Sequence, residues 1–270
     1  MSAAASRSQQ PARPTASSIS IIVPVLNEQA LIAAAVQRLR RDFAECELLV
    51  VDGGSTDATI EHVAPHARVI RTAAGRALQM NEGARHTSGD VLWFVHADTV
   101  ISPSALGQIR AALTDPGVVG GGLTLLFDAR SAGLDYLACT SNQRARRLHW
   151  IFGDQAMFVR RDVFDAVGGF PVLPVMEDLE LSRQLHHHGR LVVLPASSTA
   201  SARRILAHGT WRMVIFMQYL KALHFAGVSP QRIARRYEAG PPWPLARLRT
   251  ARRHPRPIPS YAPPEESVDV

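Results

Sequence analysis

The chain has 270 residues, of which 46% are hydrophobic, and a formal net charge of +7. This length holds one large α/β domain with tails or two small domains, and we favour the single domain. The two cysteines, Cys46 and Cys139, lie far apart without partners at metal-ligand spacing, which excludes a disulfide framework or a zinc knuckle and leaves two buried thiols.

The first 18 residues contain no apolar run. They are predicted to be a disordered leader and not a secretory signal, so we expect a cytoplasmic protein. Strands are then predicted at 19–25, 47–51, 68–71 and 91–95, alternating with helices at 27–41, 58–64 and 76–86. Asn27 is expected to cap the first helix. The alternation predicts an α/β fold with a single, mostly parallel central sheet and helices on both faces.

The second half of the chain is less regular. It is predicted to contain helices at 103–113, 134–150 and from Glu177 to 188, and strands at 118–127, 156–160 and 191–194. The helix at 210–228 is too polar to span a bilayer, so it either packs on the domain or lies at a membrane surface. Repeated prolines from Pro241 onward predict no compact structure.

Arginine carries almost all of the positive charge, because Lys221 is the only lysine among 30 basic residues. Arginine binds phosphate through paired hydrogen bonds, so a phosphorylated ligand or an anionic membrane would suit this chain. The basic residues are spread along the sequence, and a solvated basic surface explains them equally well. We expect no nucleic-acid partner.

Two acidic elements are placed where chemistry can occur. His96-Ala97-Asp98 directly follows an apolar run, which puts a carboxylate at the carboxyl end of a buried strand, where open α/β sheets hold ligands. Glu177-Asp178 begins a predicted helix much later in the chain. One carboxylate can therefore serve a metal ion and another can accept a proton.

A third element, Asp52 to Asp57, joins a strand to a helix. Gly53 allows close backbone approach, Asp52 can accept from a ribose hydroxyl or a base N–H, and Ser55 or Asp57 can cap the next helix. A plain capped turn is the alternative. The spacing is neither that of the dinucleotide fingerprint nor that of the P-loop, which argues against a dehydrogenase or a kinase.

In chain order, Ile21 to Glu28, Asp52 to Asp57, Asn81 to Ala84, His96 to Asp98 and Glu177-Asp178 resemble the family 2 glycosyltransferases of the GT-A fold. The stretches 153–155, 158–161 and 176–181 resemble more narrowly the radical-SAM/selenodomain-associated transferase 2 subgroup. The resemblance covers about residues 19–237. It divides this domain into a nucleotide-binding half (19–100), a sugar and acceptor half (101–207) and C-terminal amphipathic helices (208–237), before a Pro/Arg-rich tail (238–270).

The resemblance implies a metal-dependent inverting glycosyltransferase that moves a sugar from a nucleotide-diphosphate sugar to a hydroxyl acceptor, and it leaves open whether that acceptor is a lipid, a small molecule or a peptide. Asp98 would hold Mg²⁺ or Mn²⁺, and Asp178 would be the general base, with Glu177 as its less favoured neighbour. The donor-binding set would be Pro24, Asn27, Glu28, Asp52, Gly53, Arg76, Asn81, His96, Ala97 and Asp98.

The chain departs from the family pattern at two positions. His96 stands where the family usually has the first Asp of Asp-x-Asp, and Gly53 replaces a second acid that commonly reads the base. Nucleotide preference therefore cannot be carried over. His96 can bond a ribose hydroxyl or ligate a metal as neutral imidazole, or it can be satisfied by backbone at the strand end.

Other candidates have weaker signals. Arg76 opens a helix and is expected to meet a donor phosphate at its N-terminus, with a surface arginine as the alternative. Gly153, Asp154 and Gln155 are expected beside the sugar or the acceptor, or else in a plain turn. Arg203-Arg204 is interpreted as a solvated pair. His186 to His188 cannot converge on one ion from a helix and is expected to end that helix.

Two rival functions remain. A nucleotidyltransferase shares the α/β architecture and the metal, but the segment 19–28 offers no Lys or Arg for a triphosphate. A catalytically inactive module that binds a nucleotide sugar is compatible with the substitution at His96.

Overall fold

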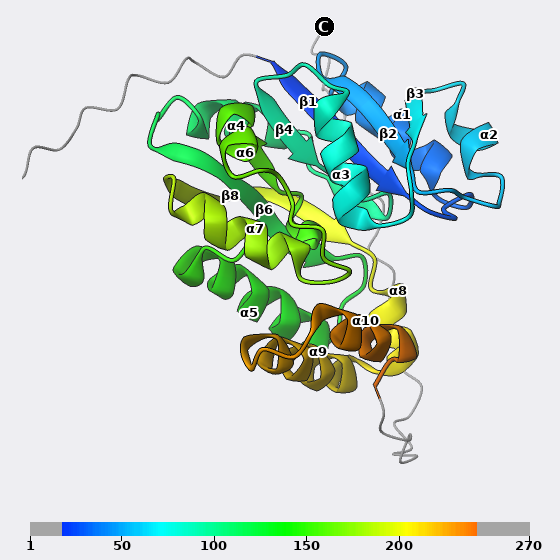
Figure 1. Ribbon diagram of the computed structural model, residues 1–270. Coiled ribbons are helices and arrows are strands. Elements are labelled where there is room, and N and C mark those ends of the chain that lie inside the picture. The colour runs from blue at the N-terminus through cyan, green and yellow to red at the C-terminus, as the bar shows by residue number, and fades with distance from the viewer. Residues whose placement is uncertain (1–17, 242–270) are drawn as a thin grey trace, which may run out of the picture.

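The computed structural model describes residues 18–241, so nearly all of the predicted leader and of the predicted tail lies outside the described residues. One sheet of eight strands runs in the order β3-β2-β1-β4-β7-β6-β8-β5 (Figure 1). Its strands are β1 (Ile19–Val25), β2 (Glu47–Asp52), β3 (Arg68–Arg71), β4 (Val91–Phe94), β5 (Thr99–Ile101), β6 (Val118–Phe127), β7 (Phe158–Arg160) and β8 (Arg190–Ala200).

The sheet has a parallel half and a mixed half. β3, β2, β1 and β4 pair in parallel, as the predicted alternation of strands and helices requires. β7 then pairs antiparallel with both β4 and β6, and β5 pairs antiparallel with β8, whereas β6 and β8 are parallel. The prediction of an α/β fold around one central sheet is confirmed, and each of the antiparallel pairings involves β7 or β8.

Helices cover both faces of the sheet. Val36 of α1 (Ile32–Asp42) and Ile109 of α4 (Ala105–Ala112) share a core with Ile21, while Met80 of α3 and Leu181 of α7 share the opposite core with Ile22. Successive strand residues thus face opposite layers, as the strand repeat dictates. The remaining elements are α2 (Thr59–Val63), α3 (Arg76–Arg85), α5 (Ala132–Leu148), the 3₁₀ turn η1 (Gly153–Gln155), α6 (Arg161–Ala166), α7 (Glu177–His186), α8 (Arg203–His208), α9 (Thr210–Phe225) and α10 (Pro230–Ala239).

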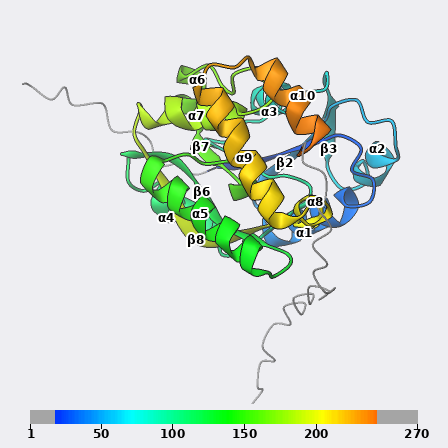
Figure 2. The same cartoon turned by 90° about the horizontal axis from the view of Figure 1, so that it is seen from below.

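The last two helices form a separate cap. Met213, Phe216 and Leu220 of α9 pack with Ile233 of α10, and Met176 at the start of α7 packs against this cluster. Figures 1 and 2 show α9 and α10 together at one end of the molecule, with α9 crossing beneath the sheet. Within residues 18–241, no helix combines the length and the apolar character needed to cross a bilayer.

The structure corrects two local predictions. Asn27 does not cap α1, which begins at Ile32 without a side-chain cap; instead Asn27 takes a left-handed backbone (φ 56°) and accepts from the Thr56 N–H. The Asn27 side chain is bound to the loop that follows β2 and therefore does not cap the helix. Cys139 is exposed on α5, and the prediction that both thiols are buried is wrong there.

The arginine pair after β7 has a structural role. Arg160 is buried and donates to the carbonyls of Leu113 and Val118, while Arg161 donates to the carbonyls of Ala84 and Gly89. These arginines thus supply hydrogen-bond partners to backbone carbonyls of four separate positions. These contacts fix β7, and with it the turn η1 that precedes it, against both halves of the sheet.

Candidate active site

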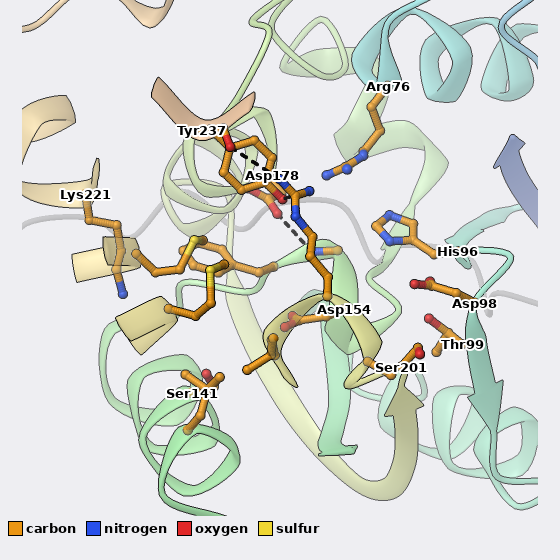
Figure 3. A pocket seen from close by; sticks show the side chains of 18 of the residues that line it. Arg76, His96, Asp98, Thr99, Ser141, Asp154, Asp178, Ser201, Lys221 and Tyr237 are labelled. Atoms are coloured by element: carbon orange, nitrogen blue, oxygen red, sulfur yellow. Dashed lines mark hydrogen bonds between the residues drawn. The ribbon is translucent and has the colours of Figure 1, made fainter. Parts of the chain in front are cut away.

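A cavity of about 1180 Å³ lies between the carboxyl ends of β1 and β4 and the helices α9 and α10. Nine of the predicted site residues line it: Pro24, Glu28, Arg76, His96, Ala97, Asp98, Gly153, Asp154 and Asp178. Several of these side chains point toward one another in Figure 3. The fold therefore brings together residues from the first strand, the fourth strand and the seventh helix.

Three predicted donor residues stay out of the cavity because they hold the loops after β1 and β2 together. Asp52 is fully buried, accepts from the N–H groups of Gly54 and Ser55, and lies 3.4 Å from the Arg71 guanidinium. Asn27 donates its N–H to Ser55 Oγ. Gly53 is covered by Gln79, which donates to the carbonyls at the ends of both strands.

His96 lines the cavity and carries one unpaired nitrogen. Its Nε2 is buried and has no hydrogen-bond partner within residues 18–241. Burial, and then the nearby Arg76 charge, lower the pKa of His96 to about 3, so the imidazole is neutral at physiological pH. The alternative in which backbone satisfies both nitrogens does not hold. A neutral ring nitrogen can accept from a ligand hydroxyl or bind a metal ion.

Asp98 is exposed within the cavity, two positions after His96 (Figure 3). Burial of Glu28 and the charge of Asp98 both raise the pKa of Glu28, which places these two acids near each other. Asp98, His96 and Thr99 all line the cavity, and His96 Nε2 and Thr99 Oγ1 are buried without partners among the described residues. Oxygen and imidazole donors of this kind fit Mg²⁺ or Mn²⁺, with phosphate oxygens completing the shell.

Arg76 stands at the N-terminus of α3, after Gly75, whose φ of 142° few other residues tolerate. Its guanidinium lies 3.4 Å from Glu177 Oε1 and interacts electrostatically with Asp178 and Asp98. The prediction that Arg76 faces the donor end is consistent with this position. A cation at a helix N-terminus, where N–H groups also point outward, is suited to phosphate.

Asp178 is held by backbone at the start of α7. Its Oδ2 accepts from the Gly153 N–H at 2.9 Å, and its Oδ1 accepts from the Leu179 N–H at 2.8 Å. The helix dipole also favours an anion in this first turn. Gly153 has little room for a side chain, because a Cβ there would lie 2.5 Å from His96 Cε1.

Two neighbouring acids hold protons more strongly than usual. Glu177 is buried behind Arg76 and does not line the main cavity; burial, and then the charge of Asp178, raise its pKa to about 7. Burial raises the pKa of Asp154 to about 6 against the opposing charge of Arg144. Asp154 Oδ1 is buried without a partner in the described part of the chain.

Two further predicted residues serve the scaffold. Asn81 exchanges hydrogen bonds of 2.8 and 2.9 Å with the Phe170 backbone and is buried. Gln155 is also buried; it accepts from Arg144 and donates to the Leu123 carbonyl. His186 ends α7, as predicted for this histidine run. Its ring stacks on that of His149.

The structure also brings in residues that the sequence analysis left aside. Arg203 and Arg204 are exposed, as expected of a solvated pair, and they also line the cavity. Arg204 donates to the Tyr237 hydroxyl at 2.8 Å and stacks on its ring. Arg144 and Lys221 line the cavity from α5 and α9. In the sequence, Lys221 stands out because it is the single lysine of the chain. No local pattern distinguishes Arg144 from the many other arginines.

Comparison with known proteins identifies the chain's relatives. A β-monoglucosyldiacylglycerol synthase from Synechocystis is 27% identical over 200 residues, covering 63% of this chain and 40% of the relative. A glucosyl-3-phosphoglycerate synthase from Mycobacterium tuberculosis is 34% identical over 122 residues, covering 40% and 36%. The chain thus spans about two fifths of the length of these curated relatives.

Solved structures share the fold. The mannosyltransferase PcManGT from Pyrobaculum calidifontis, in complex with GDP-Man and Mn²⁺, superposes with a TM-score of 0.59 at 21% identity, covering 77% of this chain and 63% of that one. TarS from S. aureus, in complex with UDP-GlcNAc, gives 0.53 at 19% identity, covering 68% and 58%. These similarities confirm the predicted GT-A fold.

The model of the family described as Glycosyl transferase family 2 matches residues 20–168, more than half of the chain. The match includes His96 and Asp98, and it ends before Glu177-Asp178. The narrower subgroup resemblance stays a prediction. The chain belongs to glycosyl transferase family 2.

Proposed function

We propose that this protein transfers a glycosyl group from a nucleotide-diphosphate sugar to a hydroxyl acceptor, with inversion at the sugar carbon. The observation that carries the proposal is that Asp98 and Asp178, from distant parts of the chain, line one cavity and both interact electrostatically with Arg76. Family membership and neighbours solved with nucleotide sugars support it.

The donor would occupy the side of the cavity formed by Pro24, Glu28, Arg76, His96 and Asp98. Asp98 and His96 are the residues that would hold Mg²⁺ or Mn²⁺, which would neutralise charge developing on the leaving diphosphate. Arg76 would bind the same diphosphate from the N-terminus of α3. Residues 19–100 would thus form the nucleotide-binding half, and the cavity wall from residues 101–237 would receive the sugar and the acceptor.

Asp178 is our choice of general base. Two backbone N–H groups bind its carboxylate and fix its orientation, and Asp178 lines the cavity. The acceptor oxygen would form its new bond to the sugar carbon while its proton passes to Asp178, and the nucleoside diphosphate would leave with the electrons of the broken bond. Glu177 is a poorer base because it is buried against Arg76 and outside the main cavity.

The first experiment separates donor binding from transfer. Purified full-length protein is titrated by calorimetry with nucleotide sugars and Mn²⁺, and nucleoside diphosphate release is measured with an acceptor panel. We expect Asp178→Asn to bind donor normally and to lose transfer by about 10³-fold, within the range for a lost general base. Asp98→Asn should lose metal-dependent donor binding. Asp165→Asn, an exposed acid in α6, is the matched control.

The same measurements decide between this proposal and its rivals. Full activity of Asp178→Asn would exclude it as the base. Tight nucleotide-sugar binding without any turnover would favour a catalytically inactive module, and pyrophosphate release from a nucleoside triphosphate would favour a nucleotidyltransferase.

We further propose peripheral contact with an anionic membrane through residues 210–228. Trp211, Ile215 and Phe225 of α9 are 55%, 58% and 50% exposed, and the chain carries a net charge of +7. Large exposed apolar groups on a basic protein are suited to an anionic bilayer surface.

A further inference from the structure

One end of the cavity holds two cations that the proposed mechanism does not use. Arg144 of α5 lies with Cζ 3.8 Å from the centre of the Phe152 ring, and Lys221 of α9 lies with Nζ 5.9 Å from the same ring. In Figure 3 Lys221 lies on the opposite side of the view from Asp98, with Asp154 and Asp178 between them. The cation pair is therefore separate from the proposed donor end.

No acid is ion-paired with either cation in the described part of the chain. Lys221 makes no hydrogen bond there, and Arg144 donates only to the Trp150 carbonyl and the Gln155 amide oxygen. Asp154 acts electrostatically on both cations and Asp178 acts on Arg144, but neither acid forms a salt bridge with them. Two neighbouring cations repel each other, and partial burial adds a cost that a bound anion would relieve.

The two helices that carry the pair also bring apolar side chains to the cavity. Leu137 and Leu148 of α5 and Met213, Met217 and Phe225 of α9 line it, and Phe225 stacks on Trp150. Methionine side chains adapt to varied apolar ligands. A ligand that fits here combines one anionic group with an apolar portion.

We propose that Arg144 and Lys221 form an anion-binding subsite for the acceptor, and that the acceptor is an amphiphile carrying a phosphate or a carboxylate. This inference rests on the proposed function, because it assigns one end of the cavity to the substrate that receives the sugar. With its anionic group held over Phe152, the acceptor would extend toward Asp154 and Asp178, where its hydroxyl meets the base. Phe152 directly precedes Gly153, which binds Asp178, so one short segment joins the subsite to the base.

Three probes of equal chain length test the subsite by calorimetry on full-length protein: octyl phosphate, octanoate and neutral octyl glucoside, each below its micelle concentration. We expect an anionic probe to bind at least about tenfold more tightly than octyl glucoside, because one charge-assisted hydrogen bond changes the affinity by about that factor. The stronger of the two anions identifies phosphate or carboxylate as the preferred group. Equal binding of the neutral probe would overturn the proposal.

Variants localise the binding. Lys221→Gln and Arg144→Gln should each lower the affinity for the anionic probe by about tenfold or more. Lys221→Arg keeps the charge and should retain most of the wild-type affinity. Arg147→Gln, an exposed arginine of the same helix α5, is the matched control and should change nothing. Unchanged binding by Lys221→Gln would overturn the proposal.

The single lysine allows a direct readout that does not depend on the Arg144 variant folding. Reductive ¹³C-methylation gives one lysine signal, identified by its loss in Lys221→Arg. Its free pKa, which burial and then Arg144 lower to about 8, should rise when octyl phosphate binds, because an anion stabilises the charged amine. A signal that neither shifts nor changes its pKa would overturn the proposal.

Donor binding keeps the two proposals distinguishable. If nucleotide sugars bind with Mn²⁺ but the anionic probes do not, the subsite is wrong and the transferase proposal stands. If the probes bind through Lys221 but no nucleotide sugar does, the transferase proposal fails while the anion site remains. Competition between a nucleotide sugar and octyl phosphate would assign the pair to the donor and overturn the acceptor assignment.

Discussion

The Gly153 N–H donates to Asp178 Oδ2 at 2.9 Å, which ties the proposed base to the turn that passes over His96. The two residues come from η1 and α7, and no local pattern links them. Because a Cβ at position 153 would lie 2.5 Å from His96 Cε1, one small residue lets the base, the turn and the strand end meet.

Gly153→Ala should separate these groups. Either His96 moves or the Gly153 N–H withdraws from Asp178, so we expect transfer to fall by about tenfold or more, with a loss of about 1–3 kcal/mol in the free energy of unfolding from overpacking. Steady-state transfer rates and denaturant unfolding measure the two effects. Gly107→Ala in α4 is the control, because a Cβ there meets nothing within 4 Å. Wild-type transfer by Gly153→Ala would show that this contact is dispensable.

Asn81→Ala should destabilise the protein and leave donor affinity unchanged. It removes both hydrogen bonds to the Phe170 backbone and leaves buried backbone groups unpaired, which costs about 1–3 kcal/mol. Urea unfolding and nucleotide-sugar calorimetry are the measurements, with the exposed Gln37→Ala as control. If the Asn81→Ala protein folds but binds the donor more weakly, Asn81 contacts the donor and this prediction is wrong.

Glu177 should make stability depend on pH. Its pKa is raised from 4.5 to about 7 in the folded protein, so the folded state holds a proton that the unfolded chain has released between these values. The stabilisation from Glu177 is complete below pH 4.5 and is lost as the pH rises through about 7. The melting temperature of Glu177→Gln should therefore fall less than that of wild type between about pH 5 and pH 8.

The comparison between variants isolates this effect. The pKa of His96 is lowered from 6.5 to about 3, so His96 decreases the free energy of unfolding as the pH falls below 6.5. This effect is the same in wild type and in Glu177→Gln and cancels in the comparison. Glu61→Gln, an exposed acid in α2, should follow the wild-type curve. Parallel curves for Glu177→Gln and wild type would contradict the assignment.

Replacing both Trp211 and Ile215 by Ala should weaken binding to vesicles that contain an anionic lipid. Each side chain would bury apolar surface in the bilayer interface, so we expect a loss of about tenfold or more for the pair in a sedimentation assay. Val100→Ala, a 40% exposed apolar residue of β5, serves as control. No binding of the wild-type protein to such vesicles would exclude the membrane proposal.

The sequence by itself was sufficient for the parallel half of the sheet and for two of the acids in the cavity. Buried apolar runs ending in polar residues locate β1, β2 and β4, and parallel strands bring their carboxyl ends to one edge. Asp98 follows from that rule alone. Asp178 was identified by its acidic pair at a helix start and by its resemblance to the family.

Only the tertiary structure decided which polar residues serve the cavity and which serve the scaffold. Asp52 and Asn81 look like ligand contacts in the sequence but form hydrogen bonds with backbone groups. Arg144 and Lys221 converge on Phe152 from two helices that are distant in the chain. Periodicity and local residue chemistry determine elements and their order. Burial, charge neighbours and pKa depend on contacts between segments far apart in the sequence, which local patterns do not encode.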